Sequence, residues 1–411
     1  MVVTTEQMVA GGDCVAHADG KRLLVPFTAP GEVLDVEETH TRRDCGRARI
    51  LRVREPSPHR VAPVCPLYGR CGGCTMQHLD GDYQRTLRAT LLAACFSHAG
   101  VALPEDGVRV TGGDYWGYRA RIQLHDGSFY AHKSHDVMPL KHCPVATAEL
   151  NAYLAAVPQH ERPRGRVQAF GDHRVTARKD GITSSVVLAR HEDAPRTAMN
   201  SGKQRAVKSG AQRRFSGTVS DESQRCDVVL CGRRLGFDVR GFFQSNLSVL
   251  EMAIPLVTSG LCGAHALDLY SGVGTFSAFL AEHFDCVTLV EHNRDALVSA
   301  LQNVASARRE CYGVSCTHFV SAHAASDIRM HGDYDACIID PPRGGMEQAV
   351  RDWLCGARIP HLRCLSCDAP AQARDVASLI HAGYRLTSLH LLDFYPQTAH
   401  IESLACLTYE G

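Results

Sequence analysis

The sequence predicts an α/β protein of several domains, the last of which contains a doubly wound, Rossmann-like sheet. Three observations lead to this prediction. The chain has 411 residues, too many for one ordinary hydrophobic core. Strand-like and helix-like segments alternate from about residue 228 onward, as in parallel sheets covered by helices. Short strand-like runs separated by glycine fill residues 1–55, as in a small β-barrel.

Composition and charge narrow the class of protein. Hydrophobic residues make up 45% of the chain and charged residues 21%, as in a soluble globular enzyme. The 44 basic and 44 acidic residues cancel, so an RNA partner would need basic residues concentrated locally. The sequence shows neither a signal-peptide pattern nor an apolar run of the ~18 residues that span a bilayer. We therefore expect a cytoplasmic protein without membrane contact, whose 18 cysteines are metal ligands or catalysts rather than disulfides.

The predicted barrel, residues 1–55, ends in a run of arginines. One interpretation is a solvated basic edge without a function, and the other is a surface that contacts RNA phosphates. The arginines are Arg42, Arg43, Arg47, Arg49, Arg52 and Arg54.

A central α+β domain is predicted for residues 56–227. It begins with a cysteine-rich segment and a helix at 82–100, and strand-like runs follow between 108 and 190. Residues 192–225 are rich in Ser, Arg and Lys and poor in large apolar residues. We interpret them as a flexible basic insertion, and whether it contacts RNA stays open.

The C-terminal domain is predicted for residues 228–411. The runs AHALDLYSG, CVTLVE, THFVSA, YDACIID and LRCLSC read as strands, and NRDALVSALQNVA and TFSAFLAEHF read as helices. LTSLHLLDFYP and IESLACLTY are joined by a short turn and predict an antiparallel hairpin at one edge of the sheet.

A glycine-rich loop, DLYSGVGTF at 268–276, follows the first strand of this domain. Gly272 and Gly274 permit a tight turn against a ligand, but the third glycine of the dinucleotide fingerprint is missing. Glu291 ends the next strand, where an acid can accept hydrogen bonds from ribose hydroxyls. The pair favours S-adenosylmethionine over NAD, and a simple strand-to-helix turn is the alternative.

Three further side chains are placed at strand ends. Asp340 precedes two prolines in IIDPPRGG, Cys367 ends a strand in LSCDAP, and Glu402 opens the last strand after FYPQTAH. A cysteine at a ligand crevice is a candidate nucleophile, and a nearby carboxylate is a candidate general base. Taken singly, Cys367 could be a buried hydrophobe and Glu402 a surface charge.

The segment CPLYGRCGGCTMQH places Cys65, Cys71 and Cys74 within ten residues. In a reducing compartment this clustering predicts a metal site that needs a fourth ligand from elsewhere.

Together these motifs resemble one family, the S-adenosylmethionine-dependent RNA uracil-5 methyltransferases. The resemblance also covers FFQSN at 242–246 and nearly the whole chain. The front part, with PGE, PSPHR and the cysteine segment, resembles the branch that carries a small RNA-binding barrel called TRAM and a 4Fe-4S cluster, and that modifies large-subunit (23S) ribosomal RNA. The resemblance implies a class I methyltransferase domain.

The resemblance also implies roles for single residues. Cys367 matches the nucleophile and Glu402 the base. Thr275 stands where many members have Asn, and Ser271 replaces a common Cys. In FFQSN, Phe242 or Phe243 is a candidate to stack on a base, and ordinary core packing of at least one of them is the alternative. The positions that match cofactor contacts are Gln244, Tyr270, Thr275, Glu291 and Asp340.

The family pattern assigns the fourth ligand to Cys143, which stands in a Cys-Pro context. Cys65, Cys71, Cys74 and Cys143 are then the expected ligands of a 4Fe-4S cluster. Four thiolates suit zinc equally well by geometry, so the nature of the metal rests on the resemblance.

The function that follows is methyl transfer from S-adenosylmethionine to carbon 5 of a uridine in RNA, with 23S rRNA favoured and the protein acting as a monomer. Three alternatives stay open: a tRNA uridine-5 methyltransferase, an RNA cytosine-5 methyltransferase, and a non-catalytic RNA-binding assembly factor.

Overall fold

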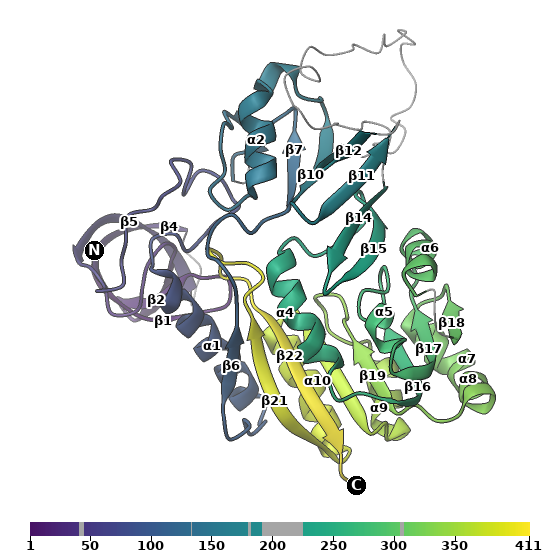
Figure 1. The fold of residues 1–411 in the computed structure, drawn as a ribbon. Coiled ribbons are helices and arrows are strands. Elements are labelled where there is room, and N and C mark those ends of the chain that lie inside the picture. Colours follow the sequence, from purple (N-terminus) through teal and green to yellow (C-terminus); the bar gives the residue numbers. More distant parts are fainter. Residues whose placement is uncertain (41–44, 133, 180–181, 191–224, 305–307) are drawn as a thin grey trace, which may run out of the picture.

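The computed structural model describes most of the chain, and its N-terminal part is a closed β-barrel (Figure 1). The described residues are 1–40, 45–132, 134–179, 182–190, 225–304 and 308–411. The barrel has the order β1-β2-β3-β5-β4 and closes because β4 also pairs with β1, which confirms the predicted small barrel. Its strands are β1 (Val2–Met8), β2 (Cys14–Ala18), β3 (Lys21–Val25), β4 (Val33–His40) and β5 (Cys45–Glu55).

The central part contains a two-stranded pair, β8-β9, and two larger sheets. One is three-stranded, with the order β13-β10-β7, and α2 packs against its apolar face. The other is four-stranded, with the order β12-β11-β14-β15. The elements are β7 (Arg121–His125), β8 (Phe129–Tyr130), β9 (Val137–Met138), α2 (Ala148–Ala156), η1 (Gln159–Glu161), β10 (Arg166–Gly171), β11 (Val175–Lys179), β12 (Ile182–Ser184), β13 (Val186–Arg190), β14 (Arg225–Leu230) and β15 (Arg233–Asp238).

The C-terminal part is an eight-stranded sheet with the order β18-β17-β16-β19-β20-β22-β21-β6. From β16 the chain winds to β17 and β18 on one side and then to β19 and β20 on the other, which is the doubly wound arrangement predicted from the sequence. The strands are β6 (Val108–Thr111), β16 (Gly263–Leu269), β17 (Phe284–Val290), β18 (Arg308–Tyr312), β19 (Ala336–Ile339), β20 (His361–Ser366), β21 (Tyr384–Leu392) and β22 (Glu402–Tyr409).

Helices cover both faces of this sheet (Figure 1). They are α1 (Gly81–His98), α4 (Leu247–Thr258), α5 (Ser277–Leu280), α6 (Arg294–Asn303), α7 (Cys316–Ala322), α8 (Ala324–His331), α9 (Gln348–Ala357) and α10 (Ala369–His381). The helix predicted at 82–100 is α1, which begins after Asp80, whose side chain accepts a hydrogen bond from the Tyr83 N–H at 2.8 Å.

Two sequence predictions for this sheet are wrong. The β21–β22 hairpin does not form the edge, because β6 pairs in parallel with β21 and becomes the edge strand. The run THFVSA is not a strand but most of α7, and Ser315 caps that helix by accepting a hydrogen bond from the His318 N–H. The strand in this region is β18, which lies before the run.

The domain division at residues 55 and 227 stays a prediction, but the packing links the parts closely. Leu92 and Phe96 of α1 lie in the same apolar cluster as β20 and α10 of the C-terminal part. A second cluster joins Phe170 of the central sheet to Phe237, Phe243 and the helix α4.

Candidate active site

The register of the sheet brings Cys367 and Glu402 together. In the antiparallel β20–β22 pair, Ser366 lies opposite Ser403. Cys367 is the residue after Ser366 and Glu402 the residue before Ser403, so the two continue this register at the end of the pair, where cross-strand neighbours are adjacent. Cys367 and Glu402, 35 positions apart in the chain, therefore lie side by side at the end of the sheet where its parallel strands have their carboxyl ends.

Burial and charge set the ionisation of this pair. Glu402 is 9% exposed, and burial, with a smaller effect of the negative charge of Asp340, raises its pKa to about 8 while Arg343 opposes the rise. Cys367 is half-buried, and its pKa is raised by burial, by Glu402 and by Asp340, again against the effect of Arg343. Arg343 was not among the predicted site residues; its place directly after the acid and two prolines of DPPRGG was the available signal.

A cavity of 240 Å³ lies at Cys367, and every part of the chain contributes to its wall. Glu402 is not one of the lining residues, but its neighbour Ile401 is. From the N-terminal parts come Ala10, Gly11, Gly72, Gly73, Thr75, Leu91 and Cys95. From the C-terminal sheet come Arg343, Cys367, Asp368, Ala369, Pro370, Thr398, Ala399, His400 and Ile401.

The glycine-rich loop places acids around the end of β16. Asp268 is 2% exposed, accepts a hydrogen bond from Ser277 Oγ, and has its pKa raised to about 7, mainly by burial, with added effects of the Asp340 and Glu291 charges. Glu291 accepts hydrogen bonds from the Gly272 N–H at 2.9 Å and the Asn293 N–H at 2.6 Å, which orient its carboxylate. Burial raises the pKa of Asp340 to about 6.

Of the other predicted cofactor contacts, Tyr270 and Thr275 belong to the same loop and Gln244 lies outside it. Tyr270 has the left-handed φ of 62° that turns the chain away from β16, and its hydroxyl donates to Glu347. Gln244 is half-buried, and its Oε1 accepts from the Tyr395 hydroxyl at 3.3 Å. Thr275 is half-buried in the loop. Tyr270 and Thr275 thus stand in the glycine-rich loop, and Gln244 contacts the segment that leads into Glu402. Their roles as cofactor contacts stay predictions.

The two phenylalanines of FFQSN differ in their surroundings. Phe243 is 3% exposed and stacks on Phe237 with ring centroids 4.1 Å apart, so it belongs to the core. Phe242 is 69% exposed and lines a 330 Å³ cavity together with Arg240 and Asn293. Only Phe242 is free to stack on a base.

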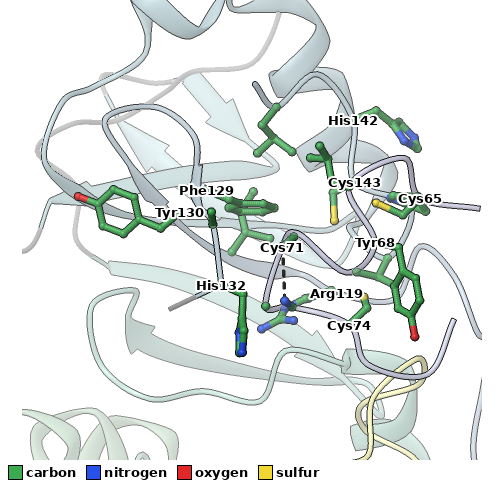
Figure 2. Close-up of a pocket in the computed structure, with 18 of the residues that line it drawn as sticks. Cys65, Tyr68, Cys71, Cys74, Arg119, Phe129, Tyr130, His132, His142 and Cys143 are labelled. Atoms are coloured by element: carbon green, nitrogen blue, oxygen red, sulfur yellow. Dashed lines mark hydrogen bonds between the residues drawn. The ribbon is translucent and has the colours of Figure 1, made fainter. Parts of the chain in front are cut away.

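The four predicted cysteine ligands line one cavity of 430 Å³ (Figure 2). Burial raises the pKa of Cys71, of Cys74 (to about 11) and of Cys143, and neighbouring cysteines add to the rise. Arg119 is the cation in the wall of this cavity that lowers these pKa values. Across the described ranges, no group of three or more Cys, His, Asp or Glu side chains is arranged to hold a single metal ion.

Residues 65–78, called the cysteine loop here, contact all parts of the protein. Tyr68 packs edge-on against Phe27 of the barrel, with centroids 5.3 Å apart. Cys71 forms an isolated antiparallel β-bridge with Ala131 of the central part. The N–H groups of Thr75 and Met76 donate to the carbonyl of Gln397 in the C-terminal part.

The barrel arginines are largely neutralised. Arg49 pairs with Glu37 and Arg54 with Asp35, both between β5 and β4, whereas Arg47 of β5 pairs with Asp13, which precedes β2. Arg42 and Arg43 lie outside the described residues, as does the predicted insertion apart from Arg225. In the part of the chain that is described, no helix is long and apolar enough to cross a membrane.

The strand order, the glycine-rich loop and the acids around it define a methyltransferase of the doubly wound class. In agreement, the fold matches the crystal structure of the Pyrococcus abyssi tRNA (uracil-54, C5)-methyltransferase in complex with S-adenosyl-L-homocysteine, with a TM-score of 0.71, 21% identity, and coverage of 99% of this chain and 100% of that one.

Sequence comparison specifies the family. Residues 240–409 match the model of the tRNA (Uracil-5-)-methyltransferase family. The chain is 30% identical to an uncharacterized RNA methyltransferase of Treponema denticola over 98% of both chains. It is also 30% identical to the 23S rRNA (uracil(1939)-C(5))-methyltransferase RlmD of Alkalilimnicola ehrlichii, over 97% of this chain and 94% of the relative. The chain belongs to the RNA uracil-5 methyltransferases, which use S-adenosylmethionine to methylate carbon 5 of uracil in RNA.

Proposed function

We propose that the protein methylates a uridine of 23S rRNA through a covalent adduct on Cys367, with Glu402 as the base that resolves it. The observation that carries this proposal is the β20–β22 register, which sets Glu402 beside Cys367, a residue in the wall of the 240 Å³ cavity. Full-length relatives named as 23S rRNA methyltransferases support the choice of RNA. We further propose the cytoplasm as its compartment, a monomer as its state, and RNA contacts from the barrel.

The chemistry requires a nucleophile because carbon 5 of uracil is weakly nucleophilic. The Cys367 thiolate adds to carbon 6, and the electron pair of the 5,6 double bond moves toward carbon 5 and the O4 carbonyl. Carbon 5 then forms its bond to the methyl group, and the C–S bond of the donor breaks. Glu402 removes the remaining proton from carbon 5, the double bond re-forms, and the Cys367 sulfur leaves.

Arg343 favours the first of these steps. Burial, Glu402 and Asp340 all disfavour the Cys367 thiolate, and the nearby guanidinium is the one positive charge among the largest influences on its pKa. A paired uridine cannot reach a half-buried cysteine, so the target base must be unstacked and flipped into the cavity. The exposed ring of Phe242 supports a stacking contact with a neighbouring base.

The residues around the glycine-rich loop suit S-adenosylmethionine, which supplies an electrophilic methyl group on a positively charged sulfur. Asp268, Glu291 and Asp340 concentrate negative charge here, which favours a cationic sulfonium and disfavours the anionic pyrophosphate of NAD. Ser271 Oγ is buried without a hydrogen-bond partner among the described residues, so a bound ligand can satisfy it. We propose cofactor contacts for Gln244, Tyr270, Thr275, Glu291 and Asp340.

The cysteine cavity fits a 4Fe-4S cluster. Four thiols line a space larger than one ion needs, and Arg119 can balance the negative charge of four thiolates. A bound cluster would be structural, because the cysteine loop joins the barrel, the central part and the C-terminal part. Protein purified without oxygen should be brown and contain about four irons per chain. Colourless protein with one zinc per chain would overturn this assignment.

Two variants test the proposed mechanism. Cys367→Ala should abolish methyl transfer and retain RNA binding, and normal turnover would exclude Cys367 as the nucleophile. Glu402→Gln should accumulate a covalent protein–RNA adduct on a denaturing gel in the presence of methyl donor. If no adduct accumulates, the role of Glu402 as base is wrong.

A tRNA target is the second candidate, because a full-length structural match is a tRNA methyltransferase. Mapping 5-methyluridine in 23S rRNA and tRNA from a strain without this gene separates the two. Loss of the modification from tRNA alone would reject the rRNA proposal. Product analysis for 5-methylcytidine tests the cytosine alternative in the same samples.

A further inference from the structure

Residues 393–401, called the base loop here, run from β21 directly into Glu402. We propose that Gln84 of α1 is a positioning residue for methyl transfer, which clamps the base loop to the cysteine loop and thereby holds Glu402 beside Cys367. The proposal rests on the proposed role of Glu402 as base.

The contacts of Gln84 carry the argument. Gln84 is fully buried, and its Nε2 donates to Gln397 Oε1 at 3.0 Å. The same Nε2 lies within hydrogen-bond distance of two carbonyls, those of Met76 (2.9 Å) and Leu79 (2.8 Å). In return, the Gln397 N–H donates to Gln84 Oε1 at 2.9 Å. Only an amide side chain can both donate and accept in this way, so a glutamate here would lose the donors.

Gln397 needs these partners because its backbone is strained. Its φ is 67°, a left-handed value that non-glycine residues keep only where neighbours over-determine it. It is 2% exposed, and its carbonyl accepts from the N–H groups of Thr75 (2.9 Å) and Met76 (3.0 Å). The clamp therefore fixes the middle of the base loop from two sides, α1 and the cysteine loop.

Other contacts attach both ends of the base loop to α1. Asp393 is fully buried and pairs with Arg88 and Arg85 of α1, both at 2.7 Å. Arg88 also donates to the carbonyl of His400, two residues before Glu402, at 3.4 Å. The base loop thus lies on α1, a helix outside the part of the chain that matches the family model.

Release of the base loop would change the surroundings of Glu402. The groups that act on Glu402 or respond to it are Asp340, Arg343, Cys367 and Tyr395. Burial is the largest cause of the raised Glu402 pKa, so water that enters beside a loosened base loop would lower this pKa. The loosened loop would also let the Glu402 carboxylate shift away from the adduct.

The test compares Gln84→Ala with Leu92→Ala. Leu92 is fully buried on the same helix but packs in the apolar cluster beneath the sheet, so its variant reports general loss of stability. The substrate is a 23S rRNA fragment that contains the mapped uridine. Rapid quenching separates the rate of adduct formation from the rate of adduct resolution.

We expect Gln84→Ala to form the adduct at the wild-type rate and resolve it roughly 10- to 100-fold more slowly, because small misplacements of a catalytic group cost this much. In this variant, the pH below which adduct resolution slows should also shift to a lower value. Leu92→Ala should unfold at a lower temperature but resolve the adduct at the wild-type rate and pH.

The proposal fails if Gln84→Ala loses thermal stability but keeps the wild-type resolution rate and its pH dependence. If Gln84→Ala does not fold, Gln84→Glu gives the same readout, since it keeps the acceptor for the Gln397 N–H and lacks the donors. Normal turnover by Glu402→Gln would instead reject the base assignment itself, so the two failures are distinguishable.

Discussion

Replacing Asp393 by Asn tests how strongly the base loop is anchored to α1. The carboxylate of Asp393 lies 2.7 Å from Arg88 Nη1 and 2.7 Å from Arg85 Nε. Asp393 and Arg88 have fully buried side chains, and Arg85 is 20% exposed. The variant keeps the shape of the side chain but removes its charge, so a buried guanidinium remains without a counter-ion.

The expected loss follows from this burial. Breaking a buried ion pair by neutralising one partner costs ~3–5 kcal/mol, because the other charge stays desolvated. For a domain of ~150–250 residues, 1 kcal/mol lowers the melting temperature by ~2–4 °C. Asp393→Asn should therefore lower the melting temperature of the C-terminal part by roughly 6–20 °C.

Differential scanning calorimetry measures this shift, and Asp106→Asn is the matched control. Asp106 pairs with Arg109 at the surface, where the side chains are 63% and 52% exposed. Such a pair contributes ~0–1 kcal/mol, so the control should shift the transition by less than ~4 °C. If Asp393→Asn lowers the melting temperature no more than the control does, the anchoring argument is wrong.

Three further predictions follow from the site. Adduct resolution should rise about ten-fold from pH 7 to pH 9 in quench experiments, because Glu402, with a pKa of about 8, becomes the carboxylate over this range; a flat profile would contradict this. In urea titrations of the ligand-free protein, the free energy of unfolding should fall as pH rises from ~5 to ~8. The pKa values of Asp268, Asp340 and Glu402 are raised in the folded protein, so over this range it keeps protons that the unfolded chain releases. A free energy of unfolding that rises over this range would show that the directions of these pKa shifts are wrong. Phe242→Ala should weaken RNA binding by ~1–3 kcal/mol in a filter assay, whereas Phe243→Ala should lower the free energy of unfolding by ~3–5 kcal/mol; equal effects of the two on binding would contradict the stacking role.

The sequence predicted the features that depend on local pattern. Short strands with glycine turns predicted the barrel, and alternation of strands and helices predicted the doubly wound sheet. THFVSA was misread because a short run of mixed apolar and polar residues fits a strand as well as a helix, and Ser315, its cap, lies outside the run. β6 has only four residues, and no local signal shows that it pairs with β21 nearly 280 positions later.

Contacts between distant buried polar groups could not be predicted. Polar residues of a helix are usually exposed, yet Gln84 and Arg88 are fully buried against their partners Gln397 and Asp393, which stand some 300 residues away in the chain. The run of barrel arginines gives no sign of its acidic partners, which stand on β4 and in the turn before β2. Hydrophobic periodicity carries no information on such pairs.

The composite wall of the 240 Å³ cavity limits how this enzyme can be re-engineered. Gly11 of the barrel and Gly72 and Gly73 of the cysteine loop line this cavity together with Cys367, so the N-terminal parts shape the chamber proposed to receive the base. Replacing the barrel with a foreign RNA-binding module would therefore deform this chamber at the same time. A fragment shortened to the C-terminal sheet would meet the same obstacle, because Cys367 would lose part of the wall that covers it.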